Sequence, residues 1–283
     1  MEFIDHEYIN LVNNIINNGY DSENTRMLPM QIIRANNINN SFPIVQHKKL
    51  FVRGVWEELL FFLKGDTDVR KLQNKGVHIW DANADPEYKK KHNKHLSDFD
   101  LGPVYGYQWR NFNSQNKDQL MDIILNLKNK SLSRRLFMSA WNPCQLDEMV
   151  LPPCHISYHF IPYVKDGVYT VDLMLYQRSA DVMLGLPFNI ASASFMLLLI
   201  CKYCGVVAGN VSICIGNAHV YNAHMKSLDK VFESYDIVKD NLTKVKCYIE
   251  GDTSVSFDEY LATVSYKIDN YYSTNKINFD LVV

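Results

Sequence analysis

The chain has 283 residues, of which 47% are hydrophobic and 21% charged, the composition of an ordinary globular protein. Its formal net charge of -2 gives no overall basic surface for DNA or RNA and leaves room only for local phosphate sites. No run of about 18 apolar residues predicts a membrane-spanning helix, and the acidic residues 1–5 are unlike a secretory signal, so we expect a soluble, intracellular, cytoplasmic protein.

The N-terminal half predicts helices separated by polar segments. Two segments have apolar residues at helical spacing: residues 5–18 and 50–63. Asn18-Gly19 ends the first helix, and residues 64–68 end the second and cap the next one. Residues 22–41 are rich in Asn and predict a loop with one short strand, and the charged, aperiodic residues 81–100 predict a surface excursion.

The C-terminal half alternates predicted strands and helices. Four segments predict strands: residues 136–141, 155–163, 169–176 and 211–215. The Lys165-Asp166-Gly167 stretch joins the second and third of these as a hairpin. Residues 119–127 predict an amphipathic helix, and residues 190–200, opened by Pro187, a buried one. Without a repeat or a linker, these elements predict a single α/β domain over residues 1–283.

The six cysteines are predicted to be free thiols, because disulfides are rare inside cells. Cys201 and Cys204 form a CxxC pair, but no second pair stands at zinc spacing. Their three-residue separation puts both near one face of a helix. We therefore expect buried structural cysteines and no metal site.

Cys154 is the candidate nucleophile. It follows Pro152 and Pro153, which fix the backbone and can present a thiol at a defined angle. Nearby cations would lower the pKa of such a thiol and raise its thiolate fraction. A buried cysteine at the start of a strand explains the same residues, so both interpretations stay open.

Two arginine motifs are candidate anion sites. Arg178, followed by Ser179, could bind a phosphate with two parallel hydrogen bonds, or it could pair with Asp181 at the rim of a pocket. Arg134 and Arg135 could converge on one anion, or form a solvated surface pair.

A third motif, Gly216-Asn217-Ala218-His219-Val220-Tyr221, suits a sugar. His219 and Tyr221 alternate, so in an extended segment both face one side and can hydrogen-bond a single hydroxyl. A histidine with a purely structural role fits the same pattern.

A series of motifs runs along the chain in a fixed order. They are GVWEELLFFLKG at 54–65, IWDAN at 79–83, DLGPVYGYQWR at 100–110, SRR at 133–135, WNP at 141–143, LPPCH at 151–155, YQRSAD at 176–181, PFNIAS at 187–192 and GNAHVY at 216–221. In this order the series resembles thymidylate synthase, the folate-dependent, flavin-independent family. The resemblance is dense from about residue 42 to residue 224.

The resemblance implies a thymidylate synthase-like α/β (α+β) fold, in which helices cover a mixed β-sheet that packs against the partner subunit of a homodimer. It implies a methyltransferase that converts dUMP to dTMP with 5,10-methylenetetrahydrofolate as the cosubstrate, without metal or flavin and without DNA or a membrane as a partner. Cys154 would add to C6 of uracil, so that C5 can attack the one-carbon unit of the folate.

The resemblance also implies roles for individual residues. The catalytic positions are Cys154, Glu58, Tyr105 and Asn189. Glu58 would transfer protons near the pyrimidine O4, and the apolar residues around it predict that it faces inward. Tyr105 would assist removal of the C5 proton, and the Asn189 amide, which donates and accepts at once, would bind the edge of uracil.

The resemblance implies two sets of binding residues. The dUMP positions are Arg26, Arg134, Arg135, Gln177, Arg178, Ser179, Asn189, His219 and Tyr221. The folate positions are Ile79, Trp80, Asn83, Asp181, Gly185, Phe188 and Val283. Trp80 would offer a flat aromatic face, Arg178 would favour the Cys154 thiolate, and the Arg134-Arg135 pair would reach the phosphate held by the other subunit.

Two closure elements depart from the family pattern. The N-terminal phosphate loop lacks its Thr/Gly series, which leaves Arg26 as the nearest arginine, and the tail 271–283 lacks the usual Pro-His-Pro. Lids exclude water, so an open site would let water replace hydride at the last step. A dUMP hydroxymethylase is therefore the first alternative function. The second is a non-catalytic homologue that binds nucleotide or RNA, which the near-neutral charge disfavours.

Overall fold

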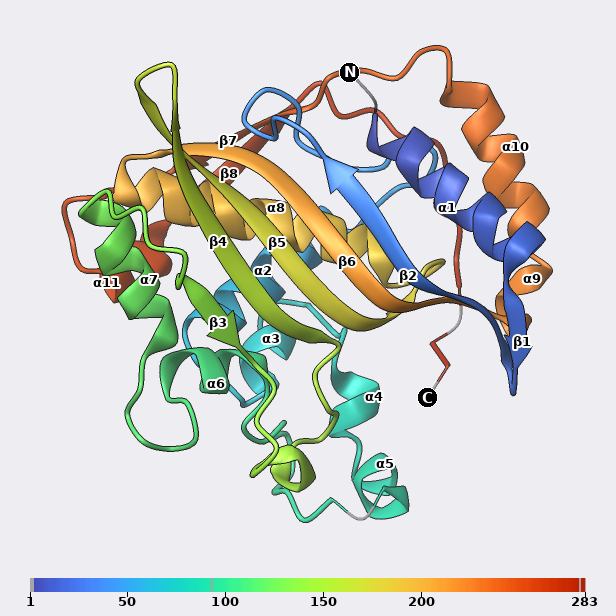
Figure 1. The fold of residues 1–283 in the computed structure, drawn as a ribbon. Coiled ribbons are helices and arrows are strands. Elements are labelled where there is room, and N and C mark those ends of the chain that lie inside the picture. Colours follow the sequence, from blue (N-terminus) through green and yellow to red (C-terminus); the bar gives the residue numbers. More distant parts are fainter. Residues whose placement is uncertain (1–2, 93, 280, 283) are drawn as a thin grey trace.

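The computed structural model describes residues 3–92, 94–279 and 281–282. A six-stranded mixed sheet forms its centre (Figure 1). In spatial order the strands are β1 (Tyr20–Ser22), β2 (Thr25–Ala35), β6 (Val207–Tyr221), β5 (Val168–Asp181), β4 (His155–Lys165) and β3 (Phe137–Ser139). Only the β5–β6 pair in this sheet is parallel, because helix α8 (Leu186–Cys204) carries the chain back between these two strands.

The β4–β5 hairpin forms where the sequence predicted it. The two strands pair from Lys165 opposite Val168 to His155 opposite Gln177. Asp166 and Gly167, between them, have positive φ angles of 51° and 78°. Two successive residues with positive φ are the requirement of the tight turn that matches the twist of a hairpin.

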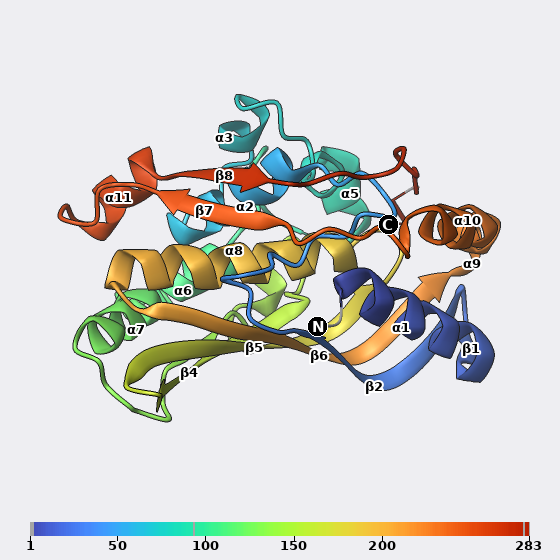
Figure 2. The same cartoon turned by 90° about the horizontal axis from the view of Figure 1, so that it is seen from above.

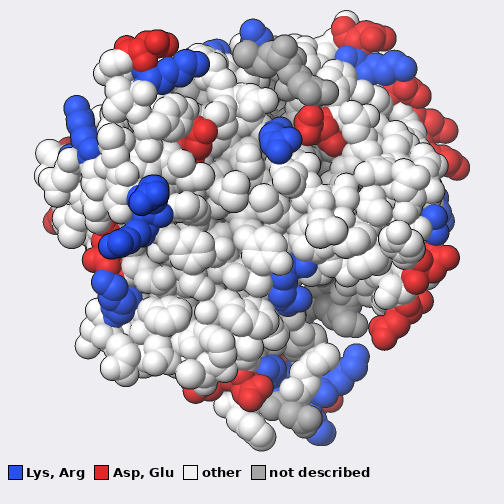
Figure 3. Space-filling view, in the orientation of Figure 1, with Lys and Arg blue, Asp and Glu red and all other residues white. Residues whose placement is uncertain are grey.

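Helices cover one face of the sheet and leave the other face bare (Figure 2). Three of them pack closest to the centre: α1 (Ile4–Asn18), α2 (Val52–Leu63) and α8. The bare face carries the exposed apolar side chains of Ile32, Met174 and Tyr176. Few charged side chains interrupt this face, and most of the charge lies at its margin (Figure 3).

Helix α8 is apolar on all sides because it lies between the sheet and α2. It is long and apolar enough to cross a membrane, but 78% of its apolar window is buried inside the protein, as in the core helix of a soluble domain. Gly205 ends it with a φ of 67°, a conformation that glycine adopts without strain. Cys201 and Cys204 are free thiols in this helix; Cys201 is buried as predicted, and Cys204 is partly exposed.

The remaining elements surround this core. The helices are α3 (Arg70–Gln73), α4 (Asp81–Ala84), α5 (Pro86–Lys91), α6 (Tyr105–Arg110), α7 (Gln119–Lys128), η1 (Leu146–Glu148), α9 (Asn222–Met225), α10 (Leu228–Val238) and α11 (Phe257–Thr263). A second, two-stranded sheet joins β7 (Lys246–Glu250) and β8 (Ser265–Asp269).

The mixed sheet under helices confirms the predicted fold class, and one local prediction is wrong. Residues 25–35 form a strand of 11 residues rather than a loop with a short strand. Residues 81–100 are mostly exposed, as a surface excursion should be, and contain two short helices, α4 and α5. The strand predicted at 211–215 is also much longer, as β6. The single domain over residues 1–283 stays a prediction.

Candidate active site

Cys154 lies in the loop that leads into β4, where hydrogen bonds fix the backbone. Its N–H donates to the Tyr105 hydroxyl at 3.0 Å, and its carbonyl accepts from the backbone N–H of Arg178 at 2.9 Å. The Arg178 guanidinium also donates to the carbonyls of Pro152 and Pro153, at 2.8 and 2.9 Å. The prolines and Arg178 together hold the loop, and with it the thiol, in one position.

Two opposing effects set the pKa of the Cys154 thiol. Burial raises this pKa above its ordinary value, and the positive charge of Arg178 lowers it, with burial the larger effect. Arg178 therefore acts in the expected direction, but the net pKa is raised. The thiol depends on Arg178 for the thiolate that it holds near neutral pH.

Glu58, in α2, is the carboxyl of this site. It accepts a hydrogen bond from Trp80 Nε1 at 2.7 Å. Burial raises its pKa to about 7, against the opposite effect of the Trp80 hydrogen bond. The charge of Glu58 also acts on Tyr105, whose pKa lies well above its ordinary value, mainly because of burial. The prediction that Glu58 faces inward is confirmed, and a carboxyl that titrates near pH 7 suits general acid–base chemistry.

Asn189 lies in the first turns of α8 and is held through its side chain. Its Oδ1 accepts from Gln177 Nε2 at 2.8 Å. Gln177 Nε2 donates in addition to the carbonyl of Ser179 at 3.1 Å. Gln177 Oε1 is buried without a hydrogen-bond partner among the residues that the structure describes. A buried acceptor of this kind fits a site that a ligand completes.

The ends of β5 and β6 bring a further polar group together. Asp181 stands beside His219 in the parallel register, as Ser179 stands beside Asn217. The rings of His219 and Tyr221 lie 5.0 Å apart, so the two residues share one side, as their alternation predicted. Burial lowers the pKa of His219, against the attraction of Asp181.

The alternative ion pair between Arg178 and Asp181 does not form in the described part of the chain, where Arg178 binds backbone carbonyls. The Asp181 carboxylate accepts instead from the backbone N–H groups of Met183 and Leu184, at 3.0 and 3.1 Å. Its carbonyl accepts from the N–H of Gly185 at 3.0 Å, which links the end of β5 to the start of α8.

The described folate positions lie on two segments, one around Trp80 and one at the start of α8. The first holds Ile79, Trp80 and Asn83, and the second Asp181, Gly185 and Phe188. Trp80 is only 7% exposed, packed edge-on against Phe62 and Tyr105. The Trp80 indole N–H already donates to Glu58. Because the ring is buried, a ligand would contact only a small part of it. Val283 lies outside the described residues.

The C-terminal segment lies across residues 45–47. The Tyr271 hydroxyl donates to the Val45 carbonyl at 3.2 Å, and the Thr274 N–H donates to the Gln46 carbonyl at 3.0 Å. Further along, the Phe279 ring lies 5.1 Å from the ring of His224. The segment is therefore anchored to the body of the protein without the Pro-His-Pro of the family pattern.

Three of the predicted phosphate arginines do not join the Cys154 cluster within the described chain. Arg134 and Arg135 are exposed in the loop before β3. Arg26 lies beside Val220 in the β2–β6 register, but its side chain binds the Asp21 carboxylate and the Ile16 carbonyl, both at 2.9 Å. Of the predicted phosphate arginines, the described residues of one chain thus bring only Arg178 to the nucleophile.

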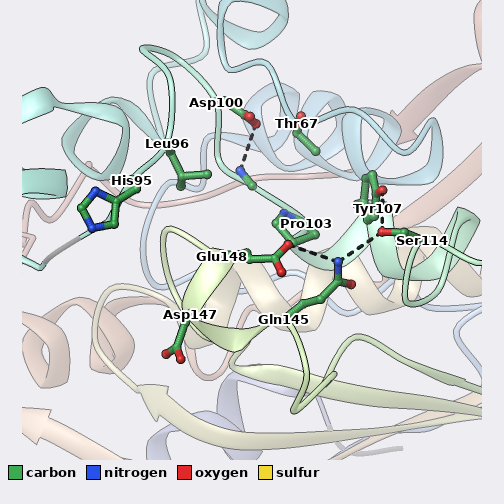
Figure 4. A pocket seen from close by; sticks show the side chains of 11 residues that line it. Thr67, His95, Leu96, Asp100, Pro103, Tyr107, Ser114, Gln145, Asp147 and Glu148 are labelled. Carbon is green, nitrogen blue, oxygen red and sulfur yellow. Dashed lines mark hydrogen bonds between the residues drawn. The ribbon is translucent and has the colours of Figure 1, made fainter.

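A cavity of about 480 Å³ lies between the loop before α6 and the turn η1 (Figure 4). Gln145 crosses its wall, and its Nε2 donates to Ser114 Oγ and Glu148 Oε2 at 3.2 Å each. None of the residues predicted for the active site lines this cavity. In the described part of the chain, no group of three or more His, Cys, Asp or Glu side chains is arranged to hold a metal.

Two residues of the cluster have no role in the sequence interpretation: His155 and Tyr158. The Tyr158 hydroxyl lies 3.2 Å from His155 Nδ1. In a regular strand, residues three apart point to opposite faces, but the register shifts between His155 and Ser157. This bulge turns both side chains to one face, and nothing in the sequence signals it.

Comparisons with known proteins agree with the motif series. The sequence profile of the thymidylate synthase family matches residues 6–283. The chain is 38% identical to a bifunctional dihydrofolate reductase-thymidylate synthase of Zea mays, over 99% of this chain and 54% of that protein. It is 41% identical to a probable thymidylate synthase of Schizosaccharomyces pombe, over 80% of this chain and 40% of that protein. The chain spans about half the length of the curated relatives it matches.

Proposed function

The chain belongs to the thymidylate synthase family, and from this premise we propose that it converts dUMP to dTMP with 5,10-methylenetetrahydrofolate as the donor of carbon and hydride. One observation carries the proposal: Cys154 is fixed by Tyr105 and Arg178, and the charge of Glu58, whose pKa is about 7, acts on the same Tyr105. A held nucleophile and a group that exchanges protons at neutral pH are what covalent catalysis on a pyrimidine needs.

The proposed reaction begins at the thiol. The Cys154 thiolate adds to C6 of uracil, and the electrons of the C5–C6 double bond make C5 nucleophilic. C5 then bonds to the one-carbon unit of the folate. Loss of the C5 proton expels the folate nitrogen from the one-carbon unit and leaves an exocyclic methylene on the pyrimidine. Transfer of a hydride from the folate to this methylene, with release of Cys154, gives dTMP and dihydrofolate. Glu58 would exchange protons near the pyrimidine O4, and Tyr105 would assist removal of the C5 proton.

The side chains around Asn189 support recognition of a pyrimidine. The Asn189 amide, held by Gln177, offers hydrogen bonds to the edge of the base. The unpartnered Gln177 Oε1 can accept a donor from the same ligand. Arg178 and Ser179 would bind the phosphate, and His219 with Tyr221 the sugar hydroxyl.

The folate would lie between the segment around Trp80 and the start of α8. Asn83 and Asp181 supply polar groups there, and Phe188 and Ile79 are partly exposed apolar side chains. Partly exposed apolar groups beside a few polar ones are typical of sites that bind a ring system. The C-terminal segment, which already lies against residues 45–47, would close over it.

We further propose a homodimer in which the bare faces of two sheets meet. The apolar side chains Ile32, Met174 and Tyr176 stand on this face, which few charges interrupt (Figure 3). The carbonyl of Arg134 contacts His159 Nε2 at 3.2 Å, and His159 lies in register with Met174. The Arg134-Arg135 pair therefore borders the bare face, where it could complete the phosphate site of the partner.

Trapping with 5-fluoro-dUMP and methylenetetrahydrofolate tests the proposal. The fluorine at C5 cannot leave as a cation, so an addition by Cys154 should persist as a covalent complex that intact-protein mass spectrometry detects. Cys154→Ala should give no complex, and Cys144→Ala, which removes an exposed thiol, should give the wild-type result. A wild-type protein that forms no complex, or a Cys154→Ala protein that does, would overturn the proposal.

A further inference from the structure

Asp5, in the first turn of α1, is a fully buried carboxylate that the proposed reaction does not use. Its Oδ1 accepts from the backbone N–H groups of Gln46 and His47, at 2.8 and 2.9 Å, and from His47 Nδ1 at 2.7 Å. Burial lowers the pKa of His47, so the ring is neutral near pH 7 and donates its one proton to Asp5. Three donors thus compensate a charge that would be costly to bury alone.

The two N–H groups that bind Asp5 belong to peptide groups whose carbonyls bind the C-terminal segment. The first peptide group contains the Val45 carbonyl, which accepts from the Tyr271 hydroxyl at 3.2 Å. The second contains the Gln46 carbonyl, which accepts from the Thr274 N–H at 3.0 Å. Each of these peptide groups therefore lies between Asp5 on one side and the C-terminal segment on the other.

The hydrogen bonds on the two sides of a peptide group strengthen each other. A carboxylate that accepts from the N–H polarises the peptide group, which makes the carbonyl oxygen a better acceptor, and hydrogen bonds to an ionised acceptor are stronger than those between neutral groups. The His47 carbonyl adds a further contact, because it accepts from the hydroxyls of Thr274 and Ser234. Within the described chain, the N–H groups of Gln46 and His47 have no acceptor besides Asp5. No other group there takes over if its charge is lost.

We propose that Asp5 is a positioning residue that, through the peptide groups of residues 45–47, holds the C-terminal segment closed over the active site. This segment lacks the Pro-His-Pro of the family pattern, and its contacts with residues 45–47 anchor its first part. A closed segment keeps water away from the exocyclic methylene. Asp5 therefore influences whether hydride or water ends the reaction. The proposal rests on the proposed function for one point, that the C-terminal segment closes over the folate.

Trypsin cleavage after Lys276 tests the proposal, because this exposed residue lies in the segment just beyond its anchor. Cleavage requires the segment to open locally, so its rate follows the open population. Asp5→Asn removes the charge and keeps the size of the side chain. Loss of residues 277–283, measured by intact-protein mass spectrometry, should become about fivefold faster, the effect of one net hydrogen bond. Asp21→Asn, which removes the exposed carboxylate that pairs with Arg26, should give the wild-type rate.

Cleavage after Lys130, in the exposed loop before β3, is the internal reference. A wild-type rate at Lys276 in a folded Asp5→Asn protein would overturn the proposal. An equal acceleration at Lys130 and Lys276 would overturn it too, because it would show general loosening of the protein. In turnover assays, the ratio of 5-hydroxymethyl-dUMP to dTMP should rise with the cleavage rate at Lys276. An active Asp5→Asn protein with an unchanged ratio would overturn the link to the reaction.

Thr274→Val provides a second test that leaves Asp5 in place, because it loosens the C-terminal segment from the other side. Coupling between two contacts is reciprocal. The Gln46 and His47 amides, whose N–H groups bind Asp5, should therefore exchange faster with deuterium, as measured by mass spectrometry on peptides within residues 44–49. Unchanged exchange would overturn the proposal even if Asp5→Asn failed to fold. A wild-type protein that forms no product would contradict the proposed function instead, and the cleavage and exchange rates would then decide the role of Asp5 alone.

Discussion

Glu58→Gln replaces the buried carboxyl of α2 by a neutral amide of nearly the same size, whose oxygen can still accept the hydrogen bond from Trp80 Nε1. Burial raises the pKa of Glu58 from its ordinary 4.5 to about 7. Between these two pH values the unfolded chain has lost this proton and the folded protein still holds it. The free energy of unfolding of the wild-type protein therefore falls as pH rises through this range, and the glutamine variant is spared this loss.

The size of the effect follows from the separation of the two pKa values. Each unit of difference between the folded and unfolded pKa corresponds to about 1.4 kcal/mol. The free energy of unfolding of the wild-type protein should therefore be lower above pH 7 than at pH 4.5, by about 3 kcal/mol, because of this carboxyl. The stability of Glu58→Gln relative to wild type should rise by this amount between pH 4.5 and pH 8.5. Groups common to both proteins cancel in the comparison. Activity should move the other way, with a fall in kcat of about 10²- to 10⁴-fold, because proton exchange is lost.

Urea unfolding followed by tryptophan fluorescence, at intervals from pH 4.5 to pH 8.5, measures the difference directly. Glu57→Gln is the matched control: it removes the neighbouring carboxylate, which is partly exposed and pairs with the more exposed Lys75 at 2.5 Å. This control should keep kcat and lose at most about 1 kcal/mol of stability. A difference between wild type and Glu58→Gln that stays constant with pH would refute the argument from burial.

Three further outcomes follow from the contacts of the site. Arg178→Gln removes the charge that lowers the pKa of Cys154, so the pH midpoint for alkylation of Cys154 by iodoacetamide should move up; an unmoved midpoint would contradict this. Mixing Cys154→Ala chains with chains that carry Arg134→Ala and Arg135→Ala should restore about a quarter of wild-type activity, because half of random dimers are mixed and each holds one intact site; no recovery would count against shared sites. Gly106→Ala would place a Cβ 1.9 Å from a backbone oxygen of α2 and should cost about 3 kcal/mol, measured by urea unfolding; an unchanged midpoint would contradict this packing.

The elements that could be predicted from the sequence are those that are defined by their own apolar pattern and turn residues. The hairpin at 155–176 has alternating apolar strands and the turn Asp166-Gly167, so both its pairing and its position follow from local sequence. Helix α8 is apolar over more than ten residues and ends at Gly205. Neither element needs information from distant parts of the chain.

Strand β2 could not be predicted because its partner defines it. Its side chains are mostly polar or partly exposed, with only Ile33 and Ala35 buried. Its long pairing is with β6, as in the pair Ile33–Ile213, which lies 180 residues apart in the chain. The strand propensity of residues 25–35 does not indicate that pairing.

The motif series identified most of the site, and the structure added how the residues act on one another. The approach of the Tyr105 hydroxyl to Cys154 joins residues 49 positions apart, and no spacing rule predicts it. The contact between Tyr158 and His155 depends on a bulge at the start of β4. The burial that raises the pKa of Glu58 likewise depends on the packing of Trp80.

The identity of the product tests the central claim most directly. The purified protein would be incubated with dUMP and 5,10-methylenetetrahydrofolate, and the mass of the nucleotide product would be measured by mass spectrometry. Attack by Cys154 followed by hydride transfer predicts dTMP, in equal amount with dihydrofolate. 5-Hydroxymethyl-dUMP would show that water ends the reaction, and unchanged dUMP would contradict the account from its first step.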